Sequence, residues 1–224
     1  MNLVLDDTIR IPAGIADDLP AFRRWTKSGN YPRRGHYAYL SGDLWVDLSM
    51  ETLLHNQLKN LFAIVLGSMV LSERLRRYFP DRMRLVNLEA NVSVEPDGMF
   101  ASSDSIQSKR VWWEQGAESL ELMGTPDIVL EIVSTHSVQK DTVVLRESYA
   151  AAGIAEYWLV SPLESLPKPD HRAVSFDILR LSAKEYIPTR KVGGWMKSAV
   201  LGRSFKLLEE KEHDELPEFR LLVR

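Results

Sequence analysis

Two neighbouring stretches decide the fold of this chain: PDIVLEIVS at residues 126–134 and KDTVVLRESYAAAGIAEYWLV at residues 140–160. The first is a mostly apolar run with the length of a buried strand. The second begins as a helix and reaches Gly153, a residue suited to the position just after a helix end because it adopts positive φ without strain. Its last residues, EYWLV, again have the composition of a strand. A strand, a helix and a second strand in succession predict a βαβ unit with two parallel strands.

The rest of the chain supplies further elements around this unit. A strand–turn–strand pattern is centred on Ser41-Gly42-Asp43, and a helical apolar stripe follows, capped by Ser49 and continuing weakly to Tyr78. Other segments predict strands over residues 85–91, 92–94, 99–101, 174–181 and 186–188, and a short helix over residues 19–26. We therefore expect the α/β (α+β) class, with a mixed central sheet flanked by helices.

Composition restricts the classes of function. The chain has 224 residues, no cysteine and a formal net charge of −3, which excludes disulfides, thiol nucleophiles and cysteine-ligated zinc. It contains no glycine-rich phosphate loop and no GxSxG motif, which disfavours the common nucleotide-binding and serine-hydrolase classes. Its apolar runs are too short to span a bilayer, and its first residues lack the pattern of a signal peptide. These patterns predict a cytoplasmic protein with no membrane partner.

The chain contains no linker long enough to divide it into two large domains. We expect an N-terminal extension over residues 1–34, one principal domain over residues 35–208 and a C-terminal tail over residues 209–224.

Glu131 is the most unusual residue of the first quoted stretch, because it places a carboxylate among apolar residues. A buried, unpaired charge is costly, and proteins retain one mainly where it meets a partner or a metal ion. Asp127 shares its strand face, and Asp97 lies in a Pro-Asp-Gly loop after strand-like sequence. Asp97 and Glu131 together offer hard oxygen ligands of the kind that magnesium uses. The alternative stays open: a Glu131 that reaches solvent or an arginine from a strand edge, and an Asp97 in an ordinary turn.

A polar seam runs beside the apolar stripe of the first long helix. Glu51, His55 and Lys59 are spaced at i, i+4 and i+8, which places them on one helix face. The residues alone leave two interpretations of His55 open: a member of the same site as the carboxylates, or a surface histidine that binds Glu51.

These segments resemble the Uma-type restriction endonuclease family, which belongs to the PD-(D/E)XK nuclease superfamily. The similarity extends to SGDLWVDLSMETLLHNQ at residues 41–57, EPDGMF at 95–100, FDILR at 176–180 and the segment from Gly194-Trp195 to Phe205. It covers residues 35–205. The resemblance implies a restriction-endonuclease-like core, in which helices flank a mixed sheet.

The resemblance also implies a metal site. Asp97 matches the family's metal-binding aspartate and Glu131 its metal-binding glutamate, and the backbone carbonyl of Ile132 would be a further ligand. Magnesium is the expected ion, and manganese is an expected substitute. Glu51, His55 and Asp127 are then expected to support the ligands or to position the substrate.

This chain departs from the family pattern at the catalytic lysine. The superfamily places a lysine two residues after the glutamate, where this chain has Val133, and relatives carry it on the next helix, where this chain has Leu145. Lys140 is nearby, and we expect it to act as the catalytic lysine in its place. Arg146 is excluded as a base because arginine stays protonated.

The resemblance therefore implies a magnesium-dependent endonuclease that hydrolyses phosphodiester bonds in DNA, with a homodimer as one expected assembly. The missing lysine leaves an alternative open, a catalytically inactive nucleic-acid-binding or regulatory protein on the same fold. A third interpretation is a structural or oligomerising protein, in which Asp97 and Glu131 are ordinary charged residues.

Overall fold

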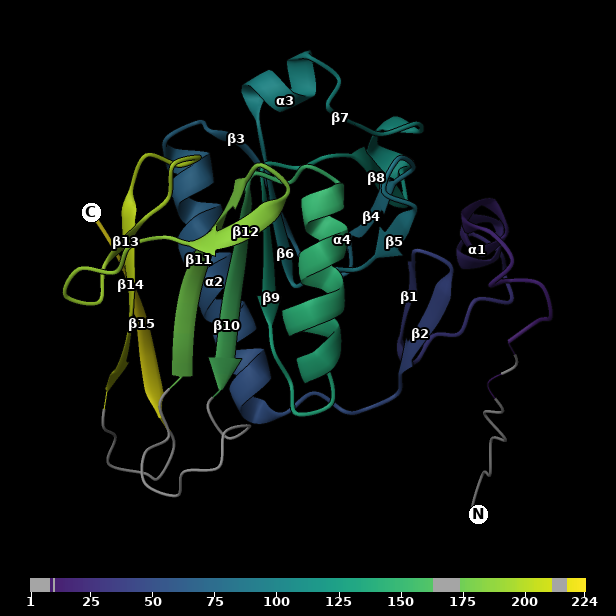
Figure 1. The fold of residues 1–224 in the computed structure, drawn as a ribbon, viewed down its shortest axis with the longest axis horizontal. Coiled ribbons are helices and arrows are strands. Elements are labelled where there is room, and N and C mark those ends of the chain that lie inside the picture. The colour runs from purple at the N-terminus through teal and green to yellow at the C-terminus, as the bar shows by residue number, and fades with distance from the viewer. Residues whose placement is uncertain (1–8, 10, 163–173, 211–216) are drawn as a thin grey trace.

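The structure is a computed structural model, and it describes residues 9, 11–162, 174–210 and 217–224. Figure 1 shows its strands arranged in layers, with helices between and outside them. The first sheet has the order β2-β1-β5-β4-β8-β7 and the second the order β12-β11-β10-β9-β6-β3. A third sheet has the order β13-β14-β15.

The bounds of the elements follow the chain. The first sheet contains β1 (His36–Leu40), β2 (Asp43–Asp47), β4 (Arg84–Asn87), β5 (Val92–Val94), β7 (Val111–Trp112) and β8 (Glu121–Gly124). The second contains β3 (Arg76–Pro80), β6 (Gly98–Ser102), β9 (Ile128–Ile132), β10 (Glu156–Pro162), β11 (Val174–Ser182) and β12 (Glu185–Pro188). The third contains β13 (Met196–Lys197), β14 (Ser204–Glu210) and β15 (Glu218–Val223). The helices are α1 (Leu19–Thr26), α2 (Leu53–Ser72), α3 (Ser103–Gln107) and α4 (Leu145–Ala151), with a π-turn (Lys140–Val144) before α4 and a 3-10 turn (Gly116–Glu118).

The predicted βαβ unit is confirmed. Strands β9 and β10 pair in parallel, with Glu131 opposite Leu159, and the π-turn and α4 lie between them along the chain. Gly153 has φ of 72° just after α4, the left-handed conformation that glycine adopts at little cost. The predicted antiparallel pair of β11 and β12 is confirmed as well, and so is the hairpin of β1 and β2.

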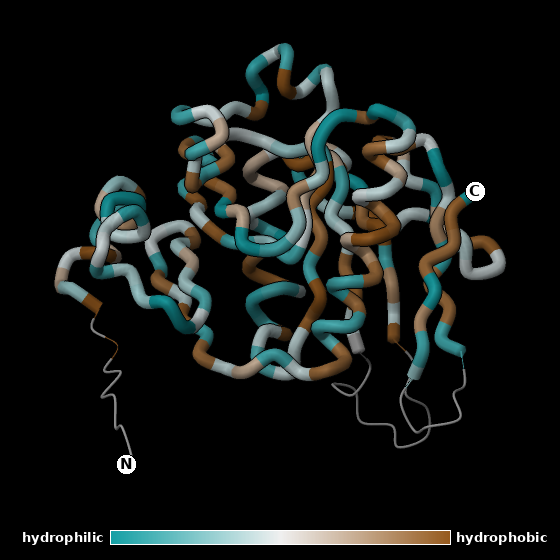
Figure 2. Tube along the Cα trace, turned by 180° about the vertical axis from the view of Figure 1, so that it is seen from behind, coloured by the Kyte–Doolittle hydropathy of each residue, from teal (hydrophilic) through white to brown (hydrophobic). Residues whose placement is uncertain are grey.

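The second sheet separates two apolar cores. On one face, Val129 and Tyr157 pack with Leu145 and Tyr149 near α4 and with residues of the first sheet. On the other face, Leu130 packs with residues of α2 and of the third sheet. Figure 2 shows the hydrophobic segments concentrated in the middle of the body and the hydrophilic ones in many of the outer turns. Because side chains alternate along a strand, Glu131 faces the same side as Val129, toward α4.

The long helix differs from its prediction at both ends. Thr52, not Ser49, is its cap, with a side chain that accepts from the backbone N–H of His55 at 3.2 Å. The helix ends at Ser72 instead of continuing to Tyr78, and Arg74 follows with φ of 55°. The next residues form β3, which pairs with β6 at the edge of the second sheet. Backbone pairing with a distant strand stabilises this extended segment, and no local pattern predicts such a partner.

Described residues of the expected N-terminal extension and of the expected C-terminal tail contribute elements to the folded body. Helix α1 buries Phe22 and Trp25 against Tyr37 and Tyr39 of β1. Strand β14 crosses the expected boundary between residues 208 and 209, and β15 pairs with it along six residue pairs from Phe205↔Val223 to Glu210↔Glu218. The expected tail therefore supplies a strand. Among the described helices, none has the length and apolar character needed to cross a membrane.

Candidate active site

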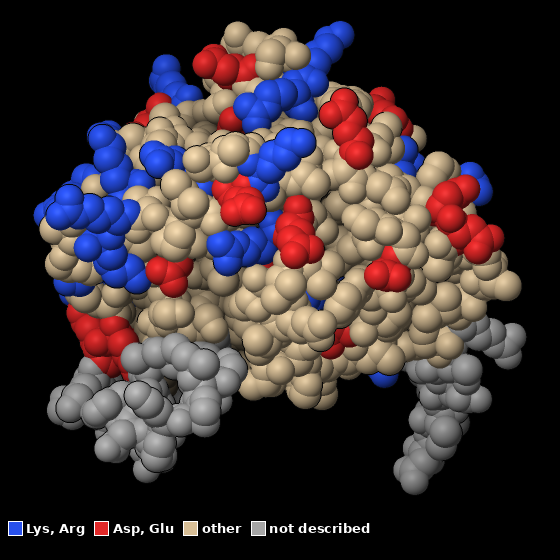
Figure 3. All heavy atoms as spheres, viewed as in Figure 1, with Lys and Arg blue, Asp and Glu red and all other residues tan. Residues whose placement is uncertain are grey.

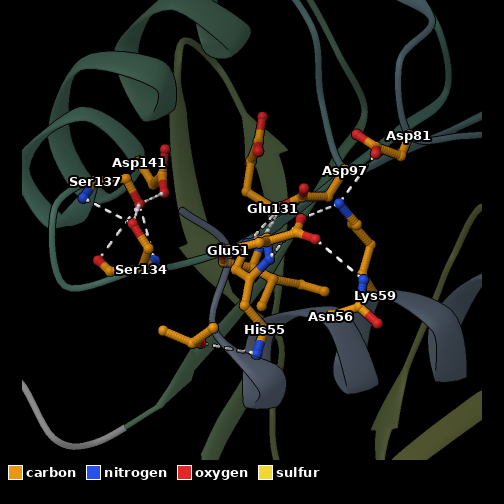
Figure 4. Close-up of polar contacts among 12 residues, drawn as sticks. Glu51, His55, Asn56, Lys59, Asp81, Asp97, Glu131, Ser134, Ser137 and Asp141 are labelled. Carbon is orange, nitrogen blue, oxygen red and sulfur yellow. Dashed lines mark hydrogen bonds and ion pairs between the residues drawn. The ribbon is translucent and has the colours of Figure 1, made fainter. Parts of the chain in front are cut away.

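A cavity of about 430 Å³ lies between the β1–β2 hairpin, the start of α2 and the C-terminal end of β9. Six of the seven residues expected at a site line it: Glu51, His55, Asp97, Glu131, Ile132 and Lys140. They come from four separate parts of the chain, and Figure 4 shows several of them converging. The structure therefore brings together side chains that the sequence could only suggest one by one.

Glu131 lies at the buried end of this cavity. Its side chain is 3% exposed, and Oε1 accepts a hydrogen bond from Tyr149 Oη at 2.6 Å. Burial raises the pKa of Glu131 well above its usual value; Lys140 opposes that shift, and the carboxylate of Asp97 adds to it. No described residue donates a hydrogen bond to Oε2. The carboxylate is therefore short of donors, and its charge is stable only with a cation or a proton beside it.

Asp97 is fixed at the same cavity by the end of β9. Its Oδ2 accepts the backbone N–H of Ile132 at 2.7 Å, which ties the loop before β6 to the neighbouring strand. The next residue is Gly98, where an added Cβ would collide with Tyr78 Oη. The Asp-Gly pair thus serves two purposes: the aspartate anchors the loop, and the glycine allows the close approach of Tyr78.

His55 connects the helix to these groups. Its Nε2 lies 2.7 Å from the carbonyl oxygen of Ile132 and 3.6 Å from Asp97 Oδ2, and its Nδ1 lies 3.1 Å from Glu51 Oε1. Both ring nitrogens face acceptors, so only the imidazolium form can donate on both sides. Burial lowers the pKa of His55, but Asp97 and Glu51 raise it more, and the net shift is upward.

Glu51 and Lys59 complete the network on the helix side. The Lys59 ammonium pairs with Glu51 and lies 3.0 Å from Asp81 Oδ2; Figure 4 shows it between these carboxylates. Burial raises the pKa of Glu51, but hydrogen bonds from Lys59 and Asn56 oppose this and lower it to about 2. Glu51 therefore remains anionic beside His55.

Lys140 reaches the cavity from the π-turn before α4. Its ammonium lies 3.0 Å from Asp141 Oδ1, and Asp141 also accepts from Ser137 Oγ. Burial lowers the pKa of Lys140, but the carboxylates of Asp141 and Glu131 raise it by more. The side chain is 21% exposed and lines the cavity, so its stem points inward and not toward bulk solvent.

The two positions that carry the lysine in relatives are apolar and buried. Val133 is 1% exposed and Leu145 is fully buried in the core between the first and second sheets. A lysine at either position would lose this packing, and Lys140 is the lysine that the structure places in the cavity.

Asp127 does not join this site. Its carboxylate accepts from the backbone N–H of Ser102 and from Ser105 Oγ, both at 2.7 Å, and Arg110 lies 3.7 Å away. It precedes β9 at the end opposite Ile132 and anchors the start of α3. The shared strand face suggested by the sequence therefore does not translate into a shared site.

Two residues of the site were missed by sequence reasoning. Tyr149 binds Glu131, and Asp141 binds Lys140. Tyr149 falls on the apolar face of α4 with Leu145 and Ala152, so its pattern is that of a core residue. The available signal was indirect: a carboxylate in an apolar strand requires a donor, and a tyrosine on the packed helix can provide one.

The donor set fits a magnesium ion, although the described residues contain no group of three His, Asp or Glu side chains arranged to hold a metal. Magnesium is commonly held by one or two carboxylates and keeps several waters. Asp97 and Glu131 supply two such groups, and among the described residues only Tyr149 donates a hydrogen bond to the Glu131 carboxylate. The Ile132 carbonyl already accepts from His55, which leaves one lone pair for a further partner.

The comparisons with known proteins agree with this fold. The family described as "Uma2: Putative restriction endonuclease" matches residues 19–204. A crystal structure of "a putative nuclease belonging to DUF820" from Anabaena variabilis ATCC 29413 is 17% identical, with a TM-score of 0.61 over 83% of this chain and 90% of that one. At this identity the likeness shows a shared fold. No curated protein matches the chain. Since the family match spans most of the sequence, from α1 to the start of β14, this chain belongs to the Uma2 family of restriction-endonuclease-like proteins.

Proposed function

We propose that the protein is a metal-dependent endonuclease that hydrolyses phosphodiester bonds in DNA. The observation that carries the proposal is the meeting of Asp97, Glu131 and Lys140 in one cavity. Two carboxylates that can hold a divalent ion, with an ammonium beside them, are suited to phosphodiester hydrolysis. Membership of the Uma2 family supports the same reaction class.

Asp97 and Glu131 would hold magnesium, with the Ile132 carbonyl as a further ligand. Bound there, the ion supplies an activated water and neutralises charge on the phosphate. The chain's own residues keep the ligands in place: Tyr149 restrains the Glu131 carboxylate, and the Ile132 N–H restrains Asp97. A preorganised carboxylate pair does not have to be reordered when the cation arrives.

Lys140 would stabilise negative charge on the phosphate. Because the carboxylates raise its pKa, it stays protonated at neutral pH and cannot accept a proton from water. An ammonium in this state suits electrostatic stabilisation of the transition state. Its ion pair with Asp141 holds it at one wall of the cavity.

His55 and Glu51 are positioning residues in this proposal. His55 donates to the Ile132 carbonyl, and Glu51 accepts from the other ring nitrogen. The pair orients the backbone at the end of β9, where the metal ligands meet. Partners that orient ligands in this way commonly contribute tenfold to a hundredfold to metal affinity or activity.

The distribution of surface charge supports a polyanionic substrate. The net charge is −3, but Figure 3 shows lysine and arginine side chains gathered at the edge where Figure 1 places β13 to β15. These strands and the residues that flank them contribute Lys197, Lys206, Arg220 and Arg224. None of these four residues lines the cavity; a basic surface of this kind would attract a nucleic-acid backbone to the protein without contacting the reacting phosphate.

A cleavage assay tests the proposal. The purified protein is incubated with supercoiled plasmid and with single-stranded DNA, in magnesium, in manganese and in EDTA. We expect cleavage only with a divalent ion, and a loss of more than about a hundredfold in a Glu131→Ala protein. Metal-independent cleavage, or full activity in the variant, would refute the assignment.

The role of Lys140 is separated from metal binding by a second pair of variants. Lys140→Ala should lose cleavage while it binds manganese as the wild type does in calorimetry, because the ammonium acts on the phosphate. Lys184→Ala is the matched control, since Lys184 is exposed in the turn between β11 and β12. If the wild type binds manganese and DNA but cleaves neither substrate, the inactive nucleic-acid-binding alternative replaces the enzyme.

A further inference from the structure

One wall of the cavity is built by the β1–β2 hairpin and differs in chemistry from the catalytic side. In the hairpin register His36 lies opposite Asp47, and Ala38 lies opposite Trp45. Cross-strand partners project from the same face of a sheet, and all four of these residues line the cavity. The wall thus presents the accessible part of the Trp45 indole, which also packs against the core near α4, with only a methyl group opposite it and an imidazole and a carboxylate beside it.

Carboxylates on this wall are poorly suited to phosphate but well suited to nucleobases. Burial raises the pKa of Asp47, but hydrogen bonds that Ser49 donates and the charge of Lys140 lower it by more, so Asp47 is anionic. Glu95 also lines the cavity, and its Oε1 accepts from Arg84 and Tyr31. Anionic oxygens repel a phosphate, whereas they accept N–H groups from the edges of cytosine, adenine and guanine.

The mouth of the cavity exposes apolar side chains. Met50 is 92% exposed and lines the cavity. Leu48 and Leu53, close to it along the chain, are 56% and 62% exposed but do not line the cavity. Clustered exposed apolar residues beside a site mark a surface that is covered when a ligand binds. Together with the Trp45 ring they offer faces on which a base can stack.

We infer that the cavity receives an unpaired nucleotide, so that the substrates are single-stranded DNA or duplexes with unpaired bases. The inference deepens the proposed function and rests on it for the identity of the polymer. A base inside a duplex is stacked on both faces and has its pairing edge occupied, so it cannot use this wall. An unpaired base can stack near Trp45 and Met50 and donate to Asp47 or Glu95. Its phosphate can then meet Lys140, which lines the same cavity.

Burial of the catalytic groups supports the same substrate class. Glu131 is 3% exposed and the Asp97 side chain 14% exposed, and they are reached through the cavity that the hairpin borders. A flexible single strand can bend its backbone into such a site. A stiff duplex can do so only after it is deformed or locally opened, which costs free energy.

A binding experiment without metal tests the inference independently of catalysis. Fluorescence anisotropy in EDTA compares a single-stranded oligonucleotide with its matched duplex and with the same duplex carrying one unpaired nucleotide. We expect the single strand to bind at least about tenfold more tightly than the matched duplex, with the interrupted duplex between them.

Substitutions in the hairpin wall and at Met50 test whether these residues cause the preference for single-stranded DNA. Met50→Ser should weaken single-strand binding by about threefold to tenfold, and Trp45→Ala by about tenfold or more, without a matching change for the duplex. Leu71→Ser is the matched control, because Leu71 is 78% exposed on α2 but does not line the cavity. Trp45→Phe keeps an aromatic ring in the wall and should restore most of the affinity lost in Trp45→Ala.

Two outcomes overturn the inference. Equal binding of single strand and duplex overturns it, and so does a preference that survives both Met50→Ser and Trp45→Ala. The proposed function is judged separately by the cleavage assay: a protein that cuts duplex and single strand equally keeps its function and loses this inference. If the protein prefers the single strand but never cleaves DNA, the inference stands and the proposed endonuclease activity is refuted.

Discussion

Two buried glutamates on neighbouring strands of the second sheet have opposite surroundings. Glu156 on β10 is 1% exposed, and its carboxylate accepts from Trp158 Nε1, Ser198 Oγ and the backbone N–H groups of Ala199 and Val200. Glu131 on β9 is 3% exposed and accepts from Tyr149. Glu156 is enclosed by donors that hold the loop after β13, whereas Glu131 opens onto a cavity.

The comparison separates a structural acid from a functional one. A buried carboxylate with a full set of donors stabilises the parts of the chain that provide them, and its free energy of burial is offset within the protein. A buried carboxylate that is short of donors retains affinity for a cation or a proton. Burial alone does not distinguish a structural acid from a functional one. The number of hydrogen-bond donors and the presence of an adjoining cavity distinguish them.

The largest expected effect is on stability, at Glu156. Glu156→Ala leaves four donors without their acceptor, and we expect the free energy of unfolding to fall by about 3 kcal/mol. The melting temperature should fall by roughly 6–12 °C for a chain of this size. Urea unfolding and thermal melting measure both quantities.

Glu185→Ala is the matched control, because Glu185 is exposed on β12 and should change stability by less than about 0.5 kcal/mol. A Glu156→Ala protein as stable as this control would contradict the structural role of Glu156. Metal-dependent cleavage should persist in Glu156→Ala at a temperature where it is folded, since Glu156 does not line the cavity.

Replacing Glu131 is expected to change the free energy of unfolding in the opposite direction when the protein is kept free of metal with EDTA. The pKa of Glu131 is raised in the folded protein, so its stabilising contribution is present below the ordinary value of 4.5 and is lost as pH rises through the folded pKa. Glu131→Gln has no such loss, so its free energy of unfolding should match that of the wild type near pH 4 and exceed it at pH 8 by on the order of 1 kcal/mol or more. Urea unfolding at a series of pH values measures the difference, and a variant less stable than wild type at pH 8 would contradict it.

The smallest effect is expected at the hydrogen bond between Tyr149 and Glu131. Tyr149→Phe removes the donor that restrains the carboxylate, and we expect manganese affinity in calorimetry to fall by about tenfold. Because this hydrogen bond lowers the pKa of Glu131, its removal should also move the acidic limb of metal binding to higher pH.

Tyr186→Phe is the control for this tyrosine. The Tyr186 hydroxyl donates to the carbonyl of Ile154 and lies outside the cavity, so its removal should leave manganese binding unchanged. If both variants bind manganese as the wild type does, Tyr149 has only a packing role.

Much of the fold was predictable because its signals are local. The bounds of α1, the β1–β2 hairpin and the parallel pairing of β9 and β10 all followed from patterns within a few dozen residues. Strand β3 was not predicted, because residues 76–78 weakly continue the helical pattern of α2 and only the backbone pairing with β6 stabilises them as a strand. The π-turn that carries Lys140 was likewise expected as ordinary helix.

By itself the sequence determined which residues were chemically unusual: an acid in an apolar strand and an acid before a glycine. These properties depend on residue type and spacing, which are explicit in the chain. Only the tertiary structure decided which of them meet. It placed Asp97, Glu131 and Lys140 in one cavity, turned Asp127 away to anchor α3, and enclosed Glu156 with donors. The physical reason is that burial, hydrogen-bond partners and charge proximity are set by segments distant in sequence, and these decide whether a carboxylate is structural or reactive.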